Sequence, residues 1–175
     1  AGATIPVGDL TLSYPSYSNN YSAVVSSDYN ITSRDQVRGR YTSNDKSGID
    51  PVVSPPLPAF VNNRKTTSKL FSLSEFHTLS GALTNEFRFG YNRYNDNIPA
   101  GNYAYPGLDA FPEILISSDQ FNTEIGPFNG APQSTILNTY QLTENLNWTK
   151  GRHTLKFGWE GRKYISSQFF TQRVR

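Results

Sequence analysis

The segment from Thr139 to Trp159 alternates apolar and polar side chains on both sides of one tight turn. The turn is Lys150-Gly151-Arg152, and Glu144 is the one polar misfit among the apolar positions. A period of two residues places all the apolar side chains on one face of an extended chain, as in a half-buried strand. The apolar positions are Tyr140, Leu142, Leu146, Trp148, Leu155, Phe157 and Trp159. The pattern predicts an antiparallel hairpin.

Two further hairpins have the same form. Residues 69–79 lead through Ser80-Gly81-Ala82 into residues 83–94, where Phe87, Phe89 and Tyr91 alternate with polar residues. Residues 21–31 lead through Ser33-Arg34-Asp35 into residues 37–41. The fold class predicted is therefore all-β, an antiparallel meander of about six long strands in three hairpins.

Composition agrees with this fold class and excludes several functions. Aromatic residues make up 14% of the chain, and they favour strands. Cysteine is absent, which rules out disulfides and thiolate metal sites. The net charge is only +2 and no basic block stands out, so nucleic acid is not an expected partner.

Short turns alternate with long connections along the chain. After an extended segment at 1–19, the β-region 20–175 contains long loops at 44–68 and 95–138, both rich in proline. Outer-membrane barrels have this rhythm, and their strands alternate lipid-facing apolar residues with polar residues of the lumen. No run approaches the ~20 apolar residues of a membrane helix, but a membrane strand needs only about 9–11 residues. The residues expected to face lipid, or the core of a soluble β-sandwich as the alternative, are Phe87, Phe89, Tyr91, Tyr140, Leu142, Leu146, Trp148, Leu155, Phe157 and Trp159.

Three segments resemble the barrel of TonB-dependent receptors, in particular the subgroup with a carboxypeptidase-regulatory-like N-terminal domain. They are residues 28–41, residues 83–93 and the hairpin 148–158, whose Lys150-Gly151-Arg152-His153-Thr154-Leu155-Lys156-Phe157-Gly158 is the most specific. The resemblance implies a plugged barrel of about 22 strands that imports a scarce nutrient with energy relayed from the inner membrane. The chain departs from this plan, because it has no recognisable plug or energy-coupling box and only about six strands.

Six strands are fewer than the ~8 of the smallest common membrane barrels. The chain is therefore expected to be an excerpt of a transporter or a receptor-like fragment with its own assembly role. A sheet that does not close has two unpaired edges, which can pair with further copies and build a filament.

Loop aromatics are the predicted ligand contacts, since rings on exposed loops can stack on sugars or other planar ligands. They are Tyr103, Tyr105, Phe111, Phe121 and Phe128. His77 and Glu75 lie on one side of a strand, but two ligands make a weak metal signal, and His153 follows a turn. No metal site, no cofactor and no catalytic motif is predicted, so an enzyme is not expected.

The sequence thus favours part of a TonB-dependent transport barrel for nutrient uptake, in the bacterial outer membrane or at the cell surface. Its expected partners are outer-membrane lipid, the rest of the barrel or further copies of the chain, and a small-molecule or glycan ligand. The alternatives are an extracellular fibre subunit built by strand pairing and a soluble carbohydrate-binding β-sandwich.

Overall fold

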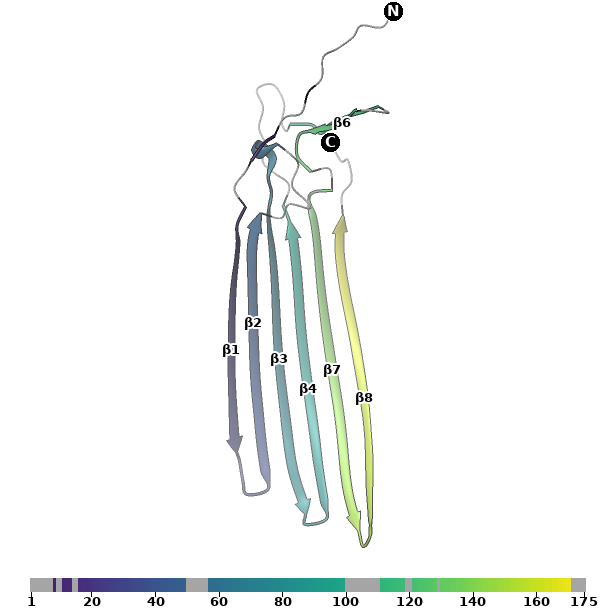
Figure 1. Ribbon diagram of the computed structural model, residues 1–175. Helices are drawn as coiled ribbons and strands as arrows, with labels where there is room; N and C mark the ends of the chain where they lie inside the picture. Colours follow the sequence, from purple (N-terminus) through teal and green to yellow (C-terminus); the bar gives the residue numbers. More distant parts are fainter. Residues whose placement is uncertain are drawn as a thin grey trace, which may run out of the picture.

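One antiparallel sheet of six long strands dominates the molecule (Figure 1). The computed structural model describes residues 8, 11–13, 16–49, 57–99, 111–118, 121–128 and 130–170. The strands follow one another across the sheet in chain order: β1 (Ser18–Asn30), β2 (Asp35–Ile49), β3 (Asn63–Ser80), β4 (Leu83–Ile98), β7 (Gln133–Lys150) and β8 (His153–Phe170). The predicted all-β meander of three hairpins is confirmed.

The two ends of the sheet differ. The turns at 31–34, 81–82 and 151–152 lie together at one end, and the long connections lie at the other (Figure 1). At the long-loop end are a short 3-10 helix, η1 (Pro58–Phe60), and a small separate sheet of β5 (Ile114–Ser118) and β6 (Phe121–Ile125). The sequence analysis predicted neither of these elements. No helix among the described residues is long and apolar enough to cross a membrane.

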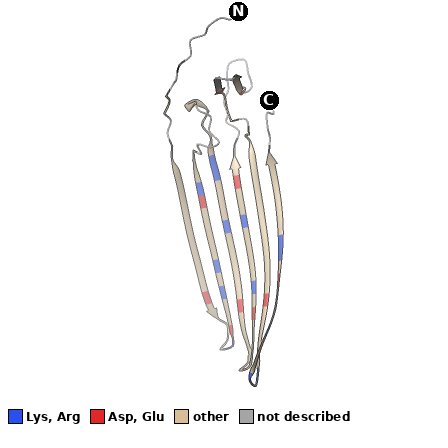
Figure 2. Ribbon diagram, turned by 45° about the vertical axis from the view of Figure 1, so that its right-hand side comes forward, with Lys and Arg blue, Asp and Glu red and all other residues tan. Residues whose placement is uncertain are grey.

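The register separates the side chains into two faces. Odd-numbered residues of β1–β4 and β8 share one face with even-numbered residues of β7. We call this the apolar face, and the opposite one the polar face. All ten residues expected to face lipid or a core lie on the apolar face. Charged residues occur along the strands and are not confined to the turns (Figure 2).

An apolar band crosses the apolar face. On β1 it extends from Tyr21 to Tyr29, and on β8 from Leu155 to Trp159. No described element packs over these side chains: Tyr29 is 68% exposed, and Phe157 and Trp159 are each 55% exposed. Within the described part of the chain, Phe60 and Ile98 are the only buried hydrophobic residues.

The soluble sandwich is therefore wrong for the described residues. A sandwich would bury this face against a second sheet, and the described residues form only the small β5–β6 sheet besides the large one. Phe157 and Leu155 are exposed, and Phe87 and Phe89 are partly exposed. An apolar band of this kind requires lipid or another apolar surface to cover it.

The strands extend further than the alternation predicts. β3 begins at Asn63 and β4 ends at Ile98, so both continue into regions expected to be loops. Their additional residues are mostly polar on both faces, so they carry no period-two signal. Phe76, which breaks the alternation, lies on the polar face, where the Arg38 guanidinium is 4.9 Å from its ring centroid.

The outermost strands are the most exposed. Every residue of β1 is exposed, and so is every residue of β8 except Gly161. Among the described residues, β1 pairs only with β2 and β8 pairs only with β7. The sheet therefore has two edges with free backbone hydrogen-bonding groups.

Candidate functional site

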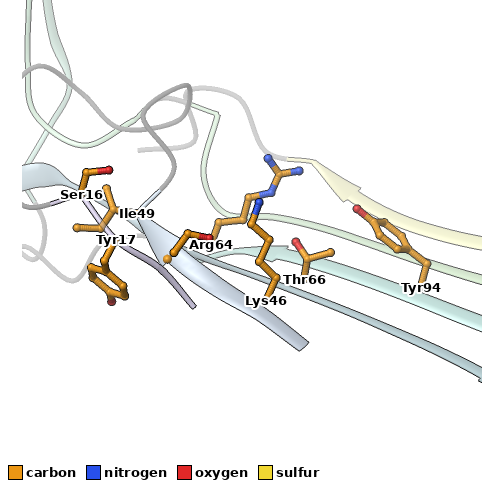
Figure 3. Close-up of a pocket in the computed structure, with 9 residues that line it drawn as sticks. Ser16, Tyr17, Lys46, Ile49, Arg64, Thr66 and Tyr94 are labelled. Carbon is orange, nitrogen blue, oxygen red and sulfur yellow. The ribbon is translucent and has the colours of Figure 1, made fainter. Parts of the chain in front are cut away.

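A pocket opens on the polar face at the long-loop end of the sheet (Figure 3). Its volume is about 580 Å³. We call it the loop-end pocket. Lys46, Arg64, Thr66 and Tyr94 line it from three neighbouring strands, and Tyr17 lines it from the segment before β1. Strand register, and not proximity in sequence, brings these side chains together.

Arg64 is held in place by Asp96. Its Nε and Nη2 donate hydrogen bonds to the two carboxylate oxygens of Asp96, at 2.9 and 2.6 Å. The Thr66 hydroxyl donates a third hydrogen bond to Asp96, at 2.8 Å. A bidentate pair of this kind fixes the plane of a guanidinium. The Arg64 side chain is therefore pre-oriented along one wall of the pocket.

Lys46 provides a second cation in the same pocket. Its side chain is exposed and extends toward the same end of the pocket as Arg64 (Figure 3). No carboxylate of the described residues forms an ion pair with Lys46. With the Tyr94 ring on a further wall, the pocket combines an unpaired ammonium, an oriented guanidinium and an aromatic face. These groups suit a ligand that carries a negative charge.

Gly48 allows the chain before β1 to close the pocket. The amide of Ile49 donates a hydrogen bond to the Tyr17 carbonyl at 3.1 Å, and a Cβ at Gly48 would collide with that same carbonyl. The Tyr17 hydroxyl accepts a hydrogen bond from Asn63 at 3.1 Å. A glycine is therefore needed where the backbone of residue 17 approaches β2.

Of the predicted loop aromatics, Phe111 and Phe128 do not line this pocket. Tyr103 and Tyr105 lie outside the described residues. Phe111 packs against Phe60 with ring centroids 5.1 Å apart, Phe121 is the first residue of β6, and Phe128 follows β6. Sequence reasoning missed Lys46, Arg64 and Asp96, because a contact across 32 residues is visible only once the register is known.

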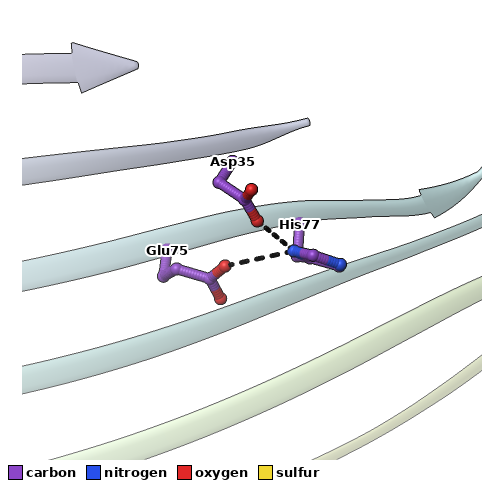
Figure 4. Close-up of side chains that lie close together, drawn as sticks. All are labelled: Asp35, Glu75 and His77. Carbon is purple, nitrogen blue, oxygen red and sulfur yellow. Dashed lines mark hydrogen bonds and ion pairs between the residues drawn. The ribbon is translucent and has the colours of Figure 1, made fainter. Parts of the chain in front are cut away.

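A second group of ionisable side chains lies on the apolar face near the short turns (Figure 4). His77 Nδ1 contacts Asp35 and lies 3.9 Å from a carboxylate oxygen of Glu75. The Thr32 hydroxyl hydrogen-bonds the second oxygen of Asp35 and so fixes that carboxylate. An imidazole and two carboxylates are ligands that divalent transition metals use. Sequence reasoning placed His77 and Glu75 on one side of a strand but missed Asp35, which comes from the neighbouring strand.

Glu144 also lies on the apolar face. Its carboxylate accepts a hydrogen bond from the Asn85 amide across β4 and β7. Phe87 lies directly opposite Glu144 on one side and directly opposite Glu75 on the other. The misfit of the alternation pattern is thus part of a row in which one phenylalanine separates two carboxylates.

The β5–β6 hairpin contains a pair of acidic residues. Burial raises the pKa of the Glu124 carboxyl, and the nearby negative charge of Glu113 raises it further. Glu124 therefore keeps its proton at a higher pH than a free side chain does.

Comparison with known proteins identifies the family. The family model described as "Outer membrane beta barrel domain" matches residues 4–175. Comparisons with curated proteins and with solved structures gave no significant match. The match covers nearly the whole sequence and agrees with the meander of long strands, the exposed apolar band and the opposing polar face. The chain belongs to the outer membrane beta barrel domain family.

Proposed function

We propose that this chain forms part of the wall of a TonB-dependent transport barrel and captures a nutrient at its long-loop end. The loop-end pocket carries the proposal. It lies on the polar face, which faces the lumen of an outer-membrane barrel, and at the end where such barrels have their extracellular loops. TonB-dependent receptors import nutrients with energy relayed from the inner membrane. The resemblance of residues 28–41, 83–93 and 148–158 to these receptors supports the same energy source for this chain.

Capture in this proposal needs no chemistry on the ligand. Lys46 and Arg64 attract a negatively charged group, and the Tyr94 ring supports a planar or sugar-like surface beside it. The polar face below the pocket continues toward the short turns with Arg88, Glu86 and other charged side chains. A ligand released from the pocket would therefore meet a wet, charged lumen.

The energy source can be tested without knowing the ligand. The full protein, extracted from outer membranes in mild detergent, is mixed with the purified periplasmic domain of TonB. We expect a complex that co-elutes in size-exclusion chromatography. Absence of a complex contradicts TonB-dependent transport and leaves the family assignment untouched.

Ligand capture is tested with trigalacturonate, an acidic sugar, against neutral maltotriose. The full protein should bind the acidic sugar more tightly, and Lys46→Gln should weaken that binding about tenfold, the effect of losing one hydrogen bond to a charged group. Lys65→Gln is the matched control, because Lys65 is at the same end of the sheet but on the apolar face. Equal binding of both sugars, or equal weakening by the control, contradicts capture in this pocket.

The two free edges of the sheet favour a second candidate function, a surface fibre. Since β1 and β8 each pair on one side only among the described residues, β8 of one copy could pair with β1 of the next. Negative-stain microscopy of the full protein decides between the two. Filaments support the fibre, and a uniform population of closed particles in detergent contradicts it.

A further inference from the structure

We infer that Lys69 and Arg93, with Lys163 beside them, form a binding site on the apolar face for the phosphate of a lipid headgroup in the outward-facing leaflet. This inference rests on the family assignment and not on transport, so it stands or fails separately from the proposed function.

The three cations lie just beyond the apolar band on the side of the long loops. On β3, Lys69 is the next residue on the apolar face after Phe71, and on β4, Arg93 is the next after Tyr91. On β8, Lys163 is the first charged residue on this face beyond Trp159. Aromatic residues at the end of a membrane strand lie at the level of the headgroups. The next residue on the same face therefore reaches the phosphates.

Lys69 and Arg93 are directly opposite each other in the β3–β4 register. Like charges at such a position repel each other and destabilise the pair of strands. Both side chains are exposed, and among the described residues no carboxylate forms an ion pair with Lys69, Arg93 or Lys163. An anion bound between Lys69 and Arg93 would replace this repulsion with two attractive contacts.

Charge on the apolar face is also divided between its two ends. Beyond the band, toward the long loops, the charged residues of this face are Lys65, Lys69, Arg93 and Lys163 against the single acid Asp45. Toward the short turns, the acids in the strands are Asp35, Glu75 and Glu144, and the one basic residue is Lys150, the last residue of β7. A uniform solvated surface gives no reason for this division, whereas a layer of anionic headgroups at one level attracts cations there.

The aromatic and amide side chains next to the cations suit contact with a lipid. The Asn138 side chain accepts hydrogen bonds from Tyr91, at 2.9 Å, and from Arg93, at 3.2 Å, and so holds the guanidinium next to the ring. Tyr91 and Tyr140 lie with ring centroids 5.0 Å apart. Phosphate would meet Arg93 and Lys69, and the glycerol and upper acyl carbons would meet the rings.

The test compares two lipids that differ only in phosphate. The full protein is reconstituted in phosphatidylcholine vesicles that contain either phosphatidic acid or diacylglycerol with the same acyl chains, and lipid retained after extraction is measured by native mass spectrometry. We expect retention of phosphatidic acid over diacylglycerol. The double variant Lys69→Gln/Arg93→Gln should reduce that preference about 30-fold, since each basic residue near a membrane surface contributes about fivefold.

The double variant Lys156→Gln/Arg162→Gln is the matched control, because it removes the same charge from the polar face. Equal loss in the control, or no loss in the first variant, overturns the site. Displacement of phosphatidic acid by inorganic phosphate alone also overturns it, because the site would then take free phosphate. Should the first variant fail to fold, the unmodified protein still decides: retention that does not fall with added salt contradicts an electrostatic site.

Discussion

Substitutions of Phe87 test whether the apolar face meets lipid, because the residues opposite Phe87 should reverse the usual cost of arginine relative to aspartate. On the lipid face of a membrane barrel, arginine costs about 2–4 kcal/mol near the midplane and aspartate costs less. At position 87, however, Glu75 and Glu144 lie directly opposite on the two adjacent strands. We expect Phe87→Arg to be tolerated better than Phe87→Asp.

The magnitude follows from the register. Directly opposed residues have Cβ atoms about 5 Å apart, where two unit charges interact by about 3 kcal/mol at an effective dielectric of 20 and about 1 kcal/mol in water. Phe89 is the reference position, because the apolar Leu73 and Leu142 lie opposite it. Each of the two carboxylates attracts arginine and repels aspartate. The preference for arginine over aspartate should therefore be about 4 kcal/mol larger at position 87 than at position 89, even if each interaction has only its value in water.

The assay is guanidinium unfolding of the full protein folded into phosphatidylcholine vesicles, with each variant compared by its free energy of unfolding. Trp148 and Trp159 report the transition, since both lie on the apolar face and are exposed. The reasoning is refuted if arginine costs more than aspartate at position 87 as it does at position 89. Equal, small costs at both positions would show that this face does not meet lipid at all.

Three further changes test local features. Gly151→Ala should lower the free energy of unfolding by about 1 kcal/mol, because Gly151 has a φ of 61°. Gly81→Ala is the control, since an added Cβ at this turn glycine meets open space, and it should change the free energy of unfolding little. Since the pKa of Glu124 is raised, the β5–β6 hairpin should become more stable as pH falls through that pKa. The measurement is amide hydrogen exchange of the hairpin against pH, corrected for intrinsic rates. Glu124→Gln or Glu113→Gln should make the exchange depend less on pH. Gly48→Ala should abolish the tighter binding of trigalacturonate by displacing the wall of the loop-end pocket, and binding at the level of the unmodified protein would contradict that packing.

The central parts of the hairpins could be predicted from the sequence because the two faces of the strands meet different surroundings there. Leu142, Leu146 and Phe157 alternate with polar neighbours, and the structure places them on one face. The outer parts could not be predicted in the same way. Around Lys46 and Asn95 both faces are polar, so no period distinguishes a strand from a loop.

The loop-end pocket was beyond sequence reasoning for a related reason. Arg64 and Asp96 meet because the β3–β4 register brings their side chains close, and that register depends on strand ends that carry no alternation. Similarly, Asp35 joins His77 and Glu75 only through the β2–β3 register. Sequence reasoning found groups that lie along one strand and missed groups assembled across strands.

The end of the apolar band toward the long loops is a row of rings on the inner strands. Tyr41, Phe71, Tyr91 and Tyr140 lie directly opposite one another on β2, β3, β4 and β7. On β1 the band reaches Tyr21, four residues nearer the long loops than this row, and on β8 it ends at Trp159, four residues nearer the short turns. The level of the band therefore descends from β1 to β8, as it would in a sheet whose strands are inclined to a flat membrane by the ~35–45° of outer-membrane barrels.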